Sequence, residues 1–298
     1  MPVIKKDRPA GDALRREFRK ILRAAIRELT DDGNPHPTHD AHSPRKRLKL
    51  LRSLLIMMRP ALNRKTFKQT DGLLRRAGKT LSKRRKAEAR VETVAKLRES
   101  KHTGRELSVI DALQAITAEE LANAGTSHTE ATKLVVLKNQ LRDLERRMKA
   151  WRLPTGDPKP YIEGMGNAYR RARKRLRHGL ATGRTADLHQ ARKSVIHHLH
   201  HIETLEAIWP SLFILWTEHL DELRAHLGEL NDYDELEGFI ARAGDRFAPP
   251  VVGIANRLIA KRRDPLKQAI ALSSARLFEE QPQAFVNRIG KMWRAFAS

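Results

Sequence analysis

Apolar residues recur at helical spacing along nearly the whole of this 298-residue chain, and this periodicity limits the fold more than any other feature. Runs in which β-branched and polar residues alternate, which would indicate strands, are absent, and aromatic residues make up only 5% of the sequence. Apolar residues reach 40%, so the chain can form a buried core instead of staying disordered. The sequence therefore predicts an all-α fold.

The expected organisation is one domain over 12–298 with two helical halves. Pro154, Gly156, Pro158 and Pro160 form the clearest linker, so we expect an N-terminal half at 12–152, a linker at 153–160 and a C-terminal half at 161–298. Single helices are predicted at about 12–29, 42–58, 107–122, 129–151, 161–178, 189–209, 211–227, 232–243, 264–278 and 282–296, with a strongly basic helical stretch that runs on to about Arg98.

A helix that begins with histidine and carries cations along one face occurs twice. The first copy begins at His42 and the second at His189, which is an offset of 147 residues. At the same offset the expected core positions also match, as Leu48 with Val195, Leu55 with Ile202, Met58 with Leu205 and Leu62 with Trp209. Core and cationic positions repeat together, which favours an internal duplication.

Each copy predicts a cationic ridge on the side of its helix away from the buried stripe, because residues three, four and seven positions apart share a helical face. The first ridge consists of His42, Arg45, Lys46, Lys49 and Arg52, and the second of His189, Arg192, Lys193 and His200, with His197 at its edge. Arginine binds phosphate oxygens as a planar fork, lysine as a point charge, and histidine as a donor that gains charge on protonation. We expect the histidines to bind protons and a polyanion together.

The charge of the whole chain agrees with an anionic partner. Lys and Arg total 59 against 35 Asp and Glu, which gives a formal net charge of +24 and a pI near 10.8. Such an excess indicates nucleic acid, an anionic membrane surface or a phosphate polymer. There are no cysteines, no signal-like segment at the start and no apolar stretch long enough to span a membrane. A cytoplasmic protein without membrane insertion is therefore expected.

The sequence shows no pattern typical of catalysis or of a bound metal or cofactor. A Gly-rich phosphate loop, a G-x-S-x-G turn and a carboxylate pair beside a nucleophile are all missing. His197 and His201 stand one helical turn apart, but no H-E-x-x-H element accompanies them, so no metal site is predicted. The acidic stretch from Asp221 to Glu237 is expected to form salt bridges with basic helices of this chain.

Several segments, in their order and spacing, resemble the CHAD family, the conserved-histidine α-helical domain, over about 12–296. These segments are His42-x-x-Arg45-Lys46 with Lys49 and Arg52, Leu81–Ala87, Tyr169–Arg173, Leu188–Val195, Ile208–Pro210, Leu227–Asp234, and the closing helices from Ala275 to Trp293. Two positions depart from the family pattern. Ile196 stands where a lysine is common, and Lys86 stands where an acidic residue is usual.

The resemblance implies two pseudo-symmetric four-helix bundles around a basic central groove or pore, and non-catalytic binding of inorganic polyphosphate. The polyphosphate-binding residues that it points to are His42, Arg45, Lys46, Lys49, Arg52, Arg170, Arg173, His189, Arg192, Lys193, His197 and His200. Association with polyphosphate granules is one role that such binding would serve. Family members are often fused to a triphosphate-cleaving domain, and the E-x-E-x-K type of element of that domain is absent here.

Two other functions stay open from the sequence. Nucleic-acid binding agrees with the charge, but aromatic residues that stack on bases are sparse and interleave poorly with the basic runs. Hydrolysis of a bound phosphate polymer would need catalytic residues that the sequence does not show. The oligomeric state cannot be predicted.

Overall fold

The computed structural model describes residues 4–6, 8–29, 44–81, 83–123, 128–243 and 246–297. Within these residues the chain is all helical and contains no strand, as the periodicity predicts. The helices are α1 (Ala10–Glu28), α2 (Pro44–Met57), α3 (Arg64–Thr80), α4 (Lys83–Arg98), α5 (Gly104–Asn123), α6 (His128–Arg147), α7 (Lys159–Thr182), α8 (Thr185–Thr204), α9 (Pro210–Ala243), α10 (Pro249–Leu277) and α11 (Pro282–Ala297), with short 3₁₀ helices η1 (Arg59–Ala61), η2 (Met148–Ala150) and η3 (Glu206–Ile208).

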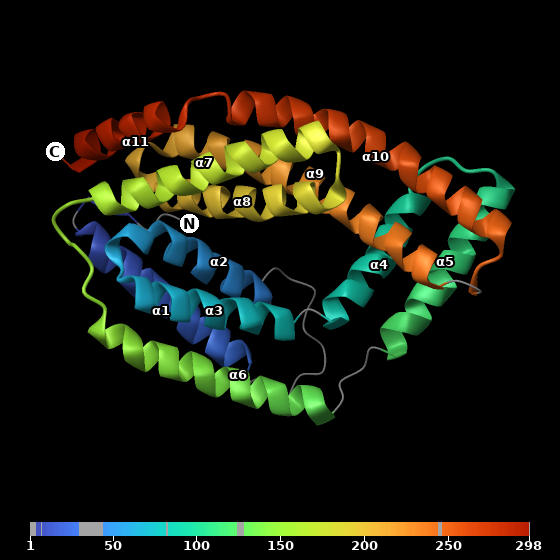
Figure 1. Cartoon of the computed structure of the whole chain (residues 1–298), viewed down its shortest axis with the longest axis horizontal. Helices are drawn as coiled ribbons and strands as arrows, with labels where there is room; N and C mark the ends of the chain where they lie inside the picture. Colours follow the sequence, from blue (N-terminus) through green and yellow to red (C-terminus); the bar gives the residue numbers. More distant parts are fainter. Residues whose placement is uncertain are drawn as a thin grey trace.

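The larger of the two hydrophobic cores is shared by both halves of the sequence. It runs from Ile4 and Leu14 in the N-terminal region to Ile289 and Trp293 in α11. In Figure 1, α1, α2, α3 and α6 lie on one side of this core, and α7 to α11 lie on the other. Helices α2 and α8 contact each other between the two groups. The two groups of helices therefore form one packed body.

A close crossing of α2 and α7 helps to set the position of α2. Gly164 of α7 lies against the backbone of Met57, and a Cβ atom at this position would collide with the Met57 carbonyl oxygen. A glycine lets two helix backbones approach closely because it has no side chain. Gly164 thus brings α2 into contact with the C-terminal half of the chain.

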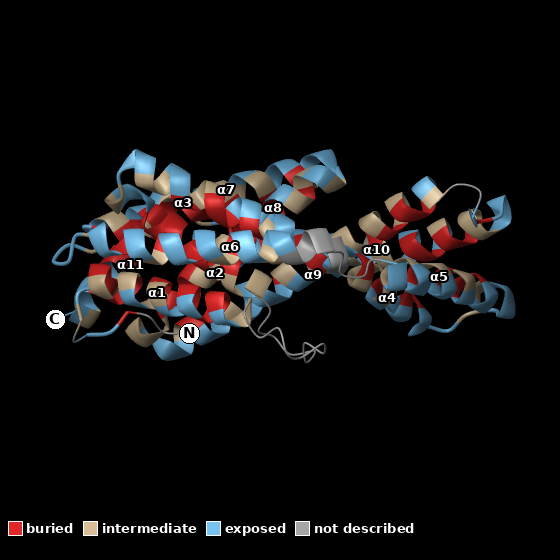
Figure 2. Cartoon of the chain, turned by 90° about the horizontal axis from the view of Figure 1, so that it is seen from below, coloured by how far each residue is buried: buried red, intermediate tan, exposed pale blue. Residues whose placement is uncertain are grey.

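The second core lies in a distal lobe, which consists of α4, α5, the C-terminal half of α9 and the N-terminal half of α10. Its buried residues include Val94 and Leu97 of α4, Leu113 of α5, Leu236 of α9 and Ile259 of α10. Figure 2 shows this lobe at one end of the molecule, with buried residues facing inward between its four helices. The lobe is joined to the main body by α9 and α10, which run through both parts.

The continuity of α9 corrects the prediction of two separate helices at 211–227 and 232–243. Between these two ranges α9 continues without a break through Gly228, Asn231 and Asp232, from Pro210 to Ala243. Leu227, Leu230 and Tyr233 keep the buried spacing across this segment. Packing on both sides of the glycine thus outweighs its low helix propensity.

The start predicted for the helix at 264–278 is also wrong. Asp264 and Pro265 read as a cap and a first-turn proline, but Pro265 lies inside α10. Residues on its N-terminal side, such as Leu258 and Ile259, are buried in the distal core, whereas Ile270 on its C-terminal side is buried in the main core. The contacts of α10 with both cores hold the helix through the proline.

Residues 151–158, which overlap the predicted linker, are not helical and connect η2 to α7. The hydroxyl of Tyr161 donates a hydrogen bond of 2.7 Å to the carbonyl oxygen of Pro154. This segment is therefore fixed against the start of α7. Among the described residues, none of the helices has the length and apolar character that crossing a membrane requires.

Candidate anion-binding site

The two helices predicted to carry cationic ridges, α2 and α8, pack against each other. Leu48 and Leu55 of α2 and Val195 and Ile202 of α8 are buried, as their spacing predicts. The last pair of matched positions, Leu62 and Trp209, was also expected in the core. Trp209 is instead 53% exposed, so the repeat of buried positions does not extend to it. Position 42, which begins the first ridge, lies outside the described residues.

One side of the α2–α8 pair opens into a cavity of about 1010 Å³, called here the basic cavity, whose walls come from α2, α4, α8 and α9. Of the predicted residues, six line it: Arg45, Lys46, Lys49, His189, Arg192 and His200. Eight lining residues are Arg or Lys and four are Asp or Glu, so the cavity is cationic overall. The structure thus brings half of the predicted set together.

The cations of α2 and α8 crowd one another inside this cavity. Burial, followed by repulsion from Arg192 and Arg45, lowers the pKa of Lys49 to about 8. Burial also lowers the pKa of Arg192, which the nearby Asp232 carboxylate partly offsets. The pKa of His189 is lowered by burial and by the cations beside it. Crowded, partly desolvated cations of this kind favour an anion that would neutralise several of them at once.

Three buried nitrogen atoms in the basic cavity have no hydrogen-bond partner within the described part of the chain. They are Nε of Arg90, Nε of Arg192 and Nδ1 of His189. A buried polar atom without a partner costs free energy, because it has lost its hydrogen bonds to water. These three residues therefore have hydrogen-bonding capacity that the described part of the protein does not use.

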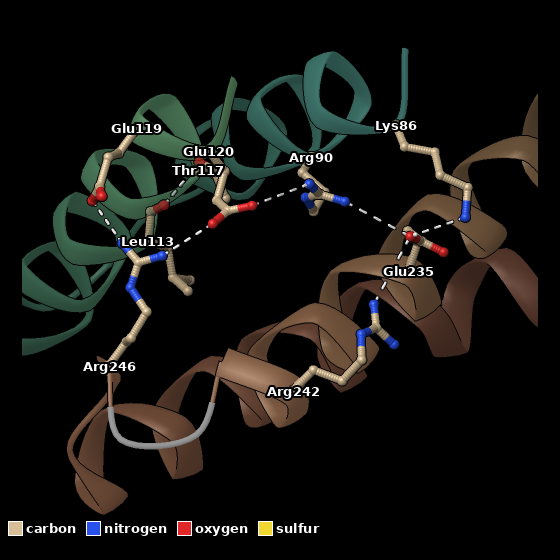
Figure 3. Close-up of polar contacts among 9 residues, drawn as sticks. All are labelled: Lys86, Arg90, Leu113, Thr117, Glu119, Glu120, Glu235, Arg242 and Arg246. Atoms are coloured by element: carbon tan, nitrogen blue, oxygen red, sulfur yellow. Dashed lines mark hydrogen bonds and ion pairs between the residues drawn. The ribbon is translucent and has the colours of Figure 1, made fainter. Parts of the chain in front are cut away.

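The fourth wall comes from α4, whose cations Arg85, Lys86 and Arg90 line the basic cavity although the sequence did not single them out as site residues. In Figure 3, Lys86 and Arg90 both point to Glu235 of α9, with N···O distances of 3.5 and 3.8 Å. The basic run on α4 was visible in the sequence, and Lys86 was noted as a departure from the family pattern. The basic run reaches the cavity only because α4 packs in the distal lobe, and this packing could not be predicted from the sequence.

The same figure shows how the distal lobe holds this wall in place. The guanidinium of Arg90 lies 4.0 Å from the carboxylate of Glu120, a contact drawn in Figure 3. It also lies 4.6 Å from the centre of the Phe239 ring, which is a cation–π contact. Arg246 in turn pairs with Glu120 and Glu119 of α5, at 3.1 and 2.6 Å. A chain of alternating charges thus runs from the basic cavity across the lobe.

The acidic stretch from Asp221 to Glu237 forms salt bridges with basic residues of the chain, as predicted. Glu237 pairs with Arg263 of α10 at 2.7 Å, whereas Asp221 pairs within α9 itself, with Arg224 at 2.6 Å. Glu229 reaches Lys96 of α4 at 3.9 Å. Among the described residues, no cluster of three or more histidine, aspartate or glutamate side chains is arranged to hold a metal ion.

The histidine cluster of α8 does not form an exposed ridge, because His198 and His201 are buried and His197 and His200 are half-buried. Nδ1 of His197 and Nδ1 of His200 each lie 2.8 Å from the hydroxyl oxygen of Ser53. His201 donates from Nε2 to the carbonyl oxygen of Ser53 at 2.7 Å. No pattern in the sequence indicates a role for Ser53, because its contacts are made between distant segments.

Burial lowers the pKa of all four clustered histidines. The pKa falls to about 3 for His198 and His200 and to about 4 for His201, and that of His197 lies well below its usual range. In the free protein His197 and His200 are therefore neutral near neutral pH, and the prediction that the histidines take up protons together with a polyanion stays untested. The physical reason is the loss of water around the rings, which disfavours the charged form.

The other predicted residues that the structure describes do not line the basic cavity. Arg52 pairs with Asp71 of α3 at 3.0 Å, and the pKa of Lys193 is lowered by burial and by the nearby Arg175 and Arg52. The neighbours of His197 include Arg52 and Arg171. Arg52, Arg171, Arg175 and Lys193 therefore form a second basic group, separated from the cavity by Ser53 and its histidines.

Arg170 and Arg173 differ in what they contact. Arg170 lines a surface hollow of about 530 Å³ together with Arg59, Arg171 and Lys174. Arg173 donates to the carbonyl oxygens of Phe278 and Glu279, at 2.9 and 3.3 Å. Arg170 is thus open to an anion, whereas Arg173 ties α7 to the segment between α10 and α11.

A family model described as the CHAD domain matches residues 12–241 of the chain. The match begins in α1 and ends in α9, so it includes all four helices that line the basic cavity. None of the curated proteins compared with the chain matches it.

Proposed function

The chain belongs to the CHAD domain family, which is associated with polyphosphate binding, and on this premise we propose that it binds inorganic polyphosphate. The polymer would lie in the basic cavity, where it would be bound without being hydrolysed. The observation that carries this proposal is the gathering of eight Arg and Lys side chains from α2, α4, α8 and α9 around one cavity, where Arg90, His189 and Arg192 also have nitrogen atoms without a hydrogen-bond partner in the described residues. A chain of phosphates supplies many acceptor oxygens and several charges at once.

The second basic group extends the proposed path of the polymer beyond the cavity. Arg52 and Lys193 of this group lie beyond Ser53 and its histidines as seen from the cavity. Arg171 of the same group also lines the surface hollow around Arg170. A long polymer would neutralise cations on both sides, whereas orthophosphate would contact only a few. Affinity is therefore expected to rise with polymer length and to fall steeply with salt, because counterions are released on binding.

Contacts between residues related by the repeat offset support the proposed pseudo-symmetry. Ser53 contacts His200, and the hydroxyl of Thr204 lies 3.7 Å from the sulfur of Met57; each pair is separated by 147 residues. In a twofold arrangement, a residue at the axis meets its own counterpart. Contacts of this kind are expected if α2 and α8 are equivalent helices of two bundles related by an axis that passes between them.

The proposal is tested by isothermal titration calorimetry with long-chain polyphosphate and with orthophosphate. Neutralising Arg45 and Lys49 together, as Arg45→Gln and Lys49→Gln, is expected to weaken polymer binding about tenfold or more. The matched control is Arg16→Gln with Lys20→Gln on α1, which removes the same charge outside the cavity and should change affinity by no more than about twofold. Equal losses in the two variants would contradict a binding site in the cavity.

Two further measurements separate this proposal from the other functions. Competition between polyphosphate and duplex DNA, at two salt concentrations, is expected to leave polyphosphate bound. Phosphate release from the polymer in the presence of Mg²⁺ is expected to stay at the background rate, and release above it would make the protein a hydrolase. We further propose that polymer binding places the protein on polyphosphate granules in the cytoplasm.

A further inference from the structure

Ser53 of α2 contacts three histidines of α8 and is completely buried. Its hydroxyl oxygen lies 2.8 Å from Nδ1 of His197, 2.8 Å from Nδ1 of His200 and 3.0 Å from the carbonyl oxygen of Lys49. All three distances are those of good hydrogen bonds. One hydroxyl group thus takes part in three hydrogen bonds.

A serine hydroxyl has one proton to donate and two lone pairs that accept. All three bonds are made when Ser53 donates to the Lys49 carbonyl and both imidazoles donate from Nδ1 to Ser53. In a neutral ring only one nitrogen carries a proton. In this arrangement the Nε2 atoms of His197 and His200 are therefore both bare acceptors.

A bare nitrogen does not bind a phosphate oxygen, because both atoms are acceptors. His200 lines the basic cavity, whereas His197 has Arg52 and Arg171 of the second basic group as neighbours. Since Ser53 occupies Nδ1 of each ring, Nε2 is the nitrogen that remains for a ligand. To donate from Nε2, a neutral ring must give up its Nδ1 proton and accept the proton of Ser53 instead.

Ser53 has only one such proton. If it donates to His200, then His197 must keep its proton on Nδ1, and the reverse holds if it donates to His197. A state with both protons on Nε2 would set one bare Nδ1 against a lone pair of Ser53 at hydrogen-bond distance.

We propose that Ser53 is a positioning residue that couples the tautomers of His197 and His200, so that only one of the two neutral rings donates to phosphate at a time. This inference rests on the proposed binding of polyphosphate. His200 in the basic cavity and His197 beside the second basic group would then compete for the one hydroxyl proton of Ser53. A phosphate held by one ring is expected to weaken the contact of the other by about fivefold, the equivalent of one ordinary hydrogen bond.

The test is ¹⁵N NMR of the imidazole nitrogens in the full chain, which reports the proton position on each ring. Calorimetry on the same samples shows whether tripolyphosphate and long-chain polyphosphate bind. With polymer bound, one ring is expected to carry its proton on Nε2 and the other on Nδ1. Both rings on Nε2, both on Nδ1, or either ring doubly protonated would each overturn the coupling. Absence of binding by calorimetry would instead overturn the proposed function.

The free protein tests the coupling without any ligand. The wild type is expected to lack the state with both protons on Nε2, whereas Ser53→Ala is expected to populate it. Because loss of a buried hydroxyl can prevent folding, His197→Gln is a second variant, in which the Ser53 proton is no longer shared between two rings and the Nε2–H form of His200 becomes more populated. His198→Leu is the control, since His198 does not contact Ser53 and its loss should leave both tautomers unchanged. Unchanged tautomers in Ser53→Ala and in His197→Gln would overturn the inference.

Discussion

The guanidinium group of Arg192 lies against the backbone of Gly228, between α8 and α9. A Cβ atom at position 228 would stand 3.1 Å from Nη2 and 3.2 Å from Nε of Arg192. A glycine inside a helix costs roughly 0.5–1 kcal/mol relative to alanine. Its presence in the middle of α9 is explained by the room that it leaves for Arg192, a half-buried arginine of the basic cavity.

Replacing Gly228 should therefore weaken polyphosphate binding without lowering the stability of the fold. Gly228→Ala is expected to weaken polyphosphate binding about tenfold, because Arg192 loses its position and with it a charged hydrogen bond. The free energy of unfolding should be maintained, because alanine favours the helix. Calorimetry and urea denaturation measure the two effects. Gly238→Ala is the matched control, since Gly238 lies on the same helix against Arg242 and outside the cavity lining. A loss of affinity in both variants would contradict the role of Gly228.

Lys49 makes binding sensitive to pH on the alkaline side. Burial and the cations around it lower its pKa to about 8, so the free protein loses this charge as pH rises from 7 to 9. Polyphosphate stabilises the charged form and must then supply the free energy of proton uptake, about 1.4 kcal/mol for each pH unit above the pKa. Affinity is expected to fall about tenfold between pH 7 and pH 9.

The measurement is calorimetry at several pH values in buffers of different ionisation enthalpy, which also gives the number of protons taken up. Lys49→Arg keeps its charge over this range and should remove most of the slope. A flat profile from pH 7 to 9 in the wild type, with a steep rise only below pH 6.5, would contradict the role of Lys49 and restore the histidines as the titrating groups.

The sequence was a good guide to features that depend on local spacing. The helix around Leu48 and Leu55 and the pairing of His189 with Arg192 on one face follow from the helical period alone. The continuity of α9 and α10 could not be predicted, because packing against two separate cores outweighs Gly228 and Pro265. Local propensity is weaker than the burial of many side chains.

The functional surface was predicted only in part, for a similar reason. Periodicity shows which residues share a face but not what lies opposite that face. The layer of Ser53 and His200 divides the predicted ridges into two groups, and Arg90 joins the cavity from a segment far along the chain. Each of these contacts is set by tertiary packing, so no pattern within one helix indicates it.

The buried histidines should make the fold sensitive to acid. In the unfolded chain a histidine has a pKa near 6.5, whereas that of His198, His200 and His201 is lowered to about 3, 3 and 4 by burial. Between these values the unfolded chain binds more protons, so the free energy of unfolding falls as pH decreases below 6.5. The expected slope is about 1.4 kcal/mol per histidine per pH unit, until the folded rings titrate near pH 3–4.

Urea denaturation at pH 7, 6 and 5 measures this slope, and His198→Leu isolates one histidine. The ring of His198 is packed among Tyr169, Phe278 and Phe285, and neither nitrogen has a hydrogen-bond partner in the described chain. The variant should be about 1 kcal/mol more stable at pH 7, because an unpaired buried polar group is removed. The free energy of unfolding of the variant should also depend less on pH, by the contribution of one histidine. A stability independent of pH from 7 to 5 would contradict the burial of neutral histidines.

Glu235 pairs with cations of the basic cavity and is expected to compete there with a bound polymer. Its carboxylate lies within 4.0 Å of Lys86, Arg90 and Arg242, and two of these cations line the basic cavity. None of the three ion pairs is shorter than 3.5 Å, so the carboxylate lowers the local positive potential without forming a close hydrogen-bonded salt bridge.

Glu235→Gln is expected to raise the affinity for polyphosphate about threefold to tenfold at low salt, and less at high salt. Glu237→Gln is the control, because Glu237 pairs with Arg263 outside the cavity lining and removes the same charge. If Glu235 instead positions Lys86 and Arg90 for the ligand, the affinity of Glu235→Gln will fall, and the sign of the change measured by calorimetry decides between the two roles.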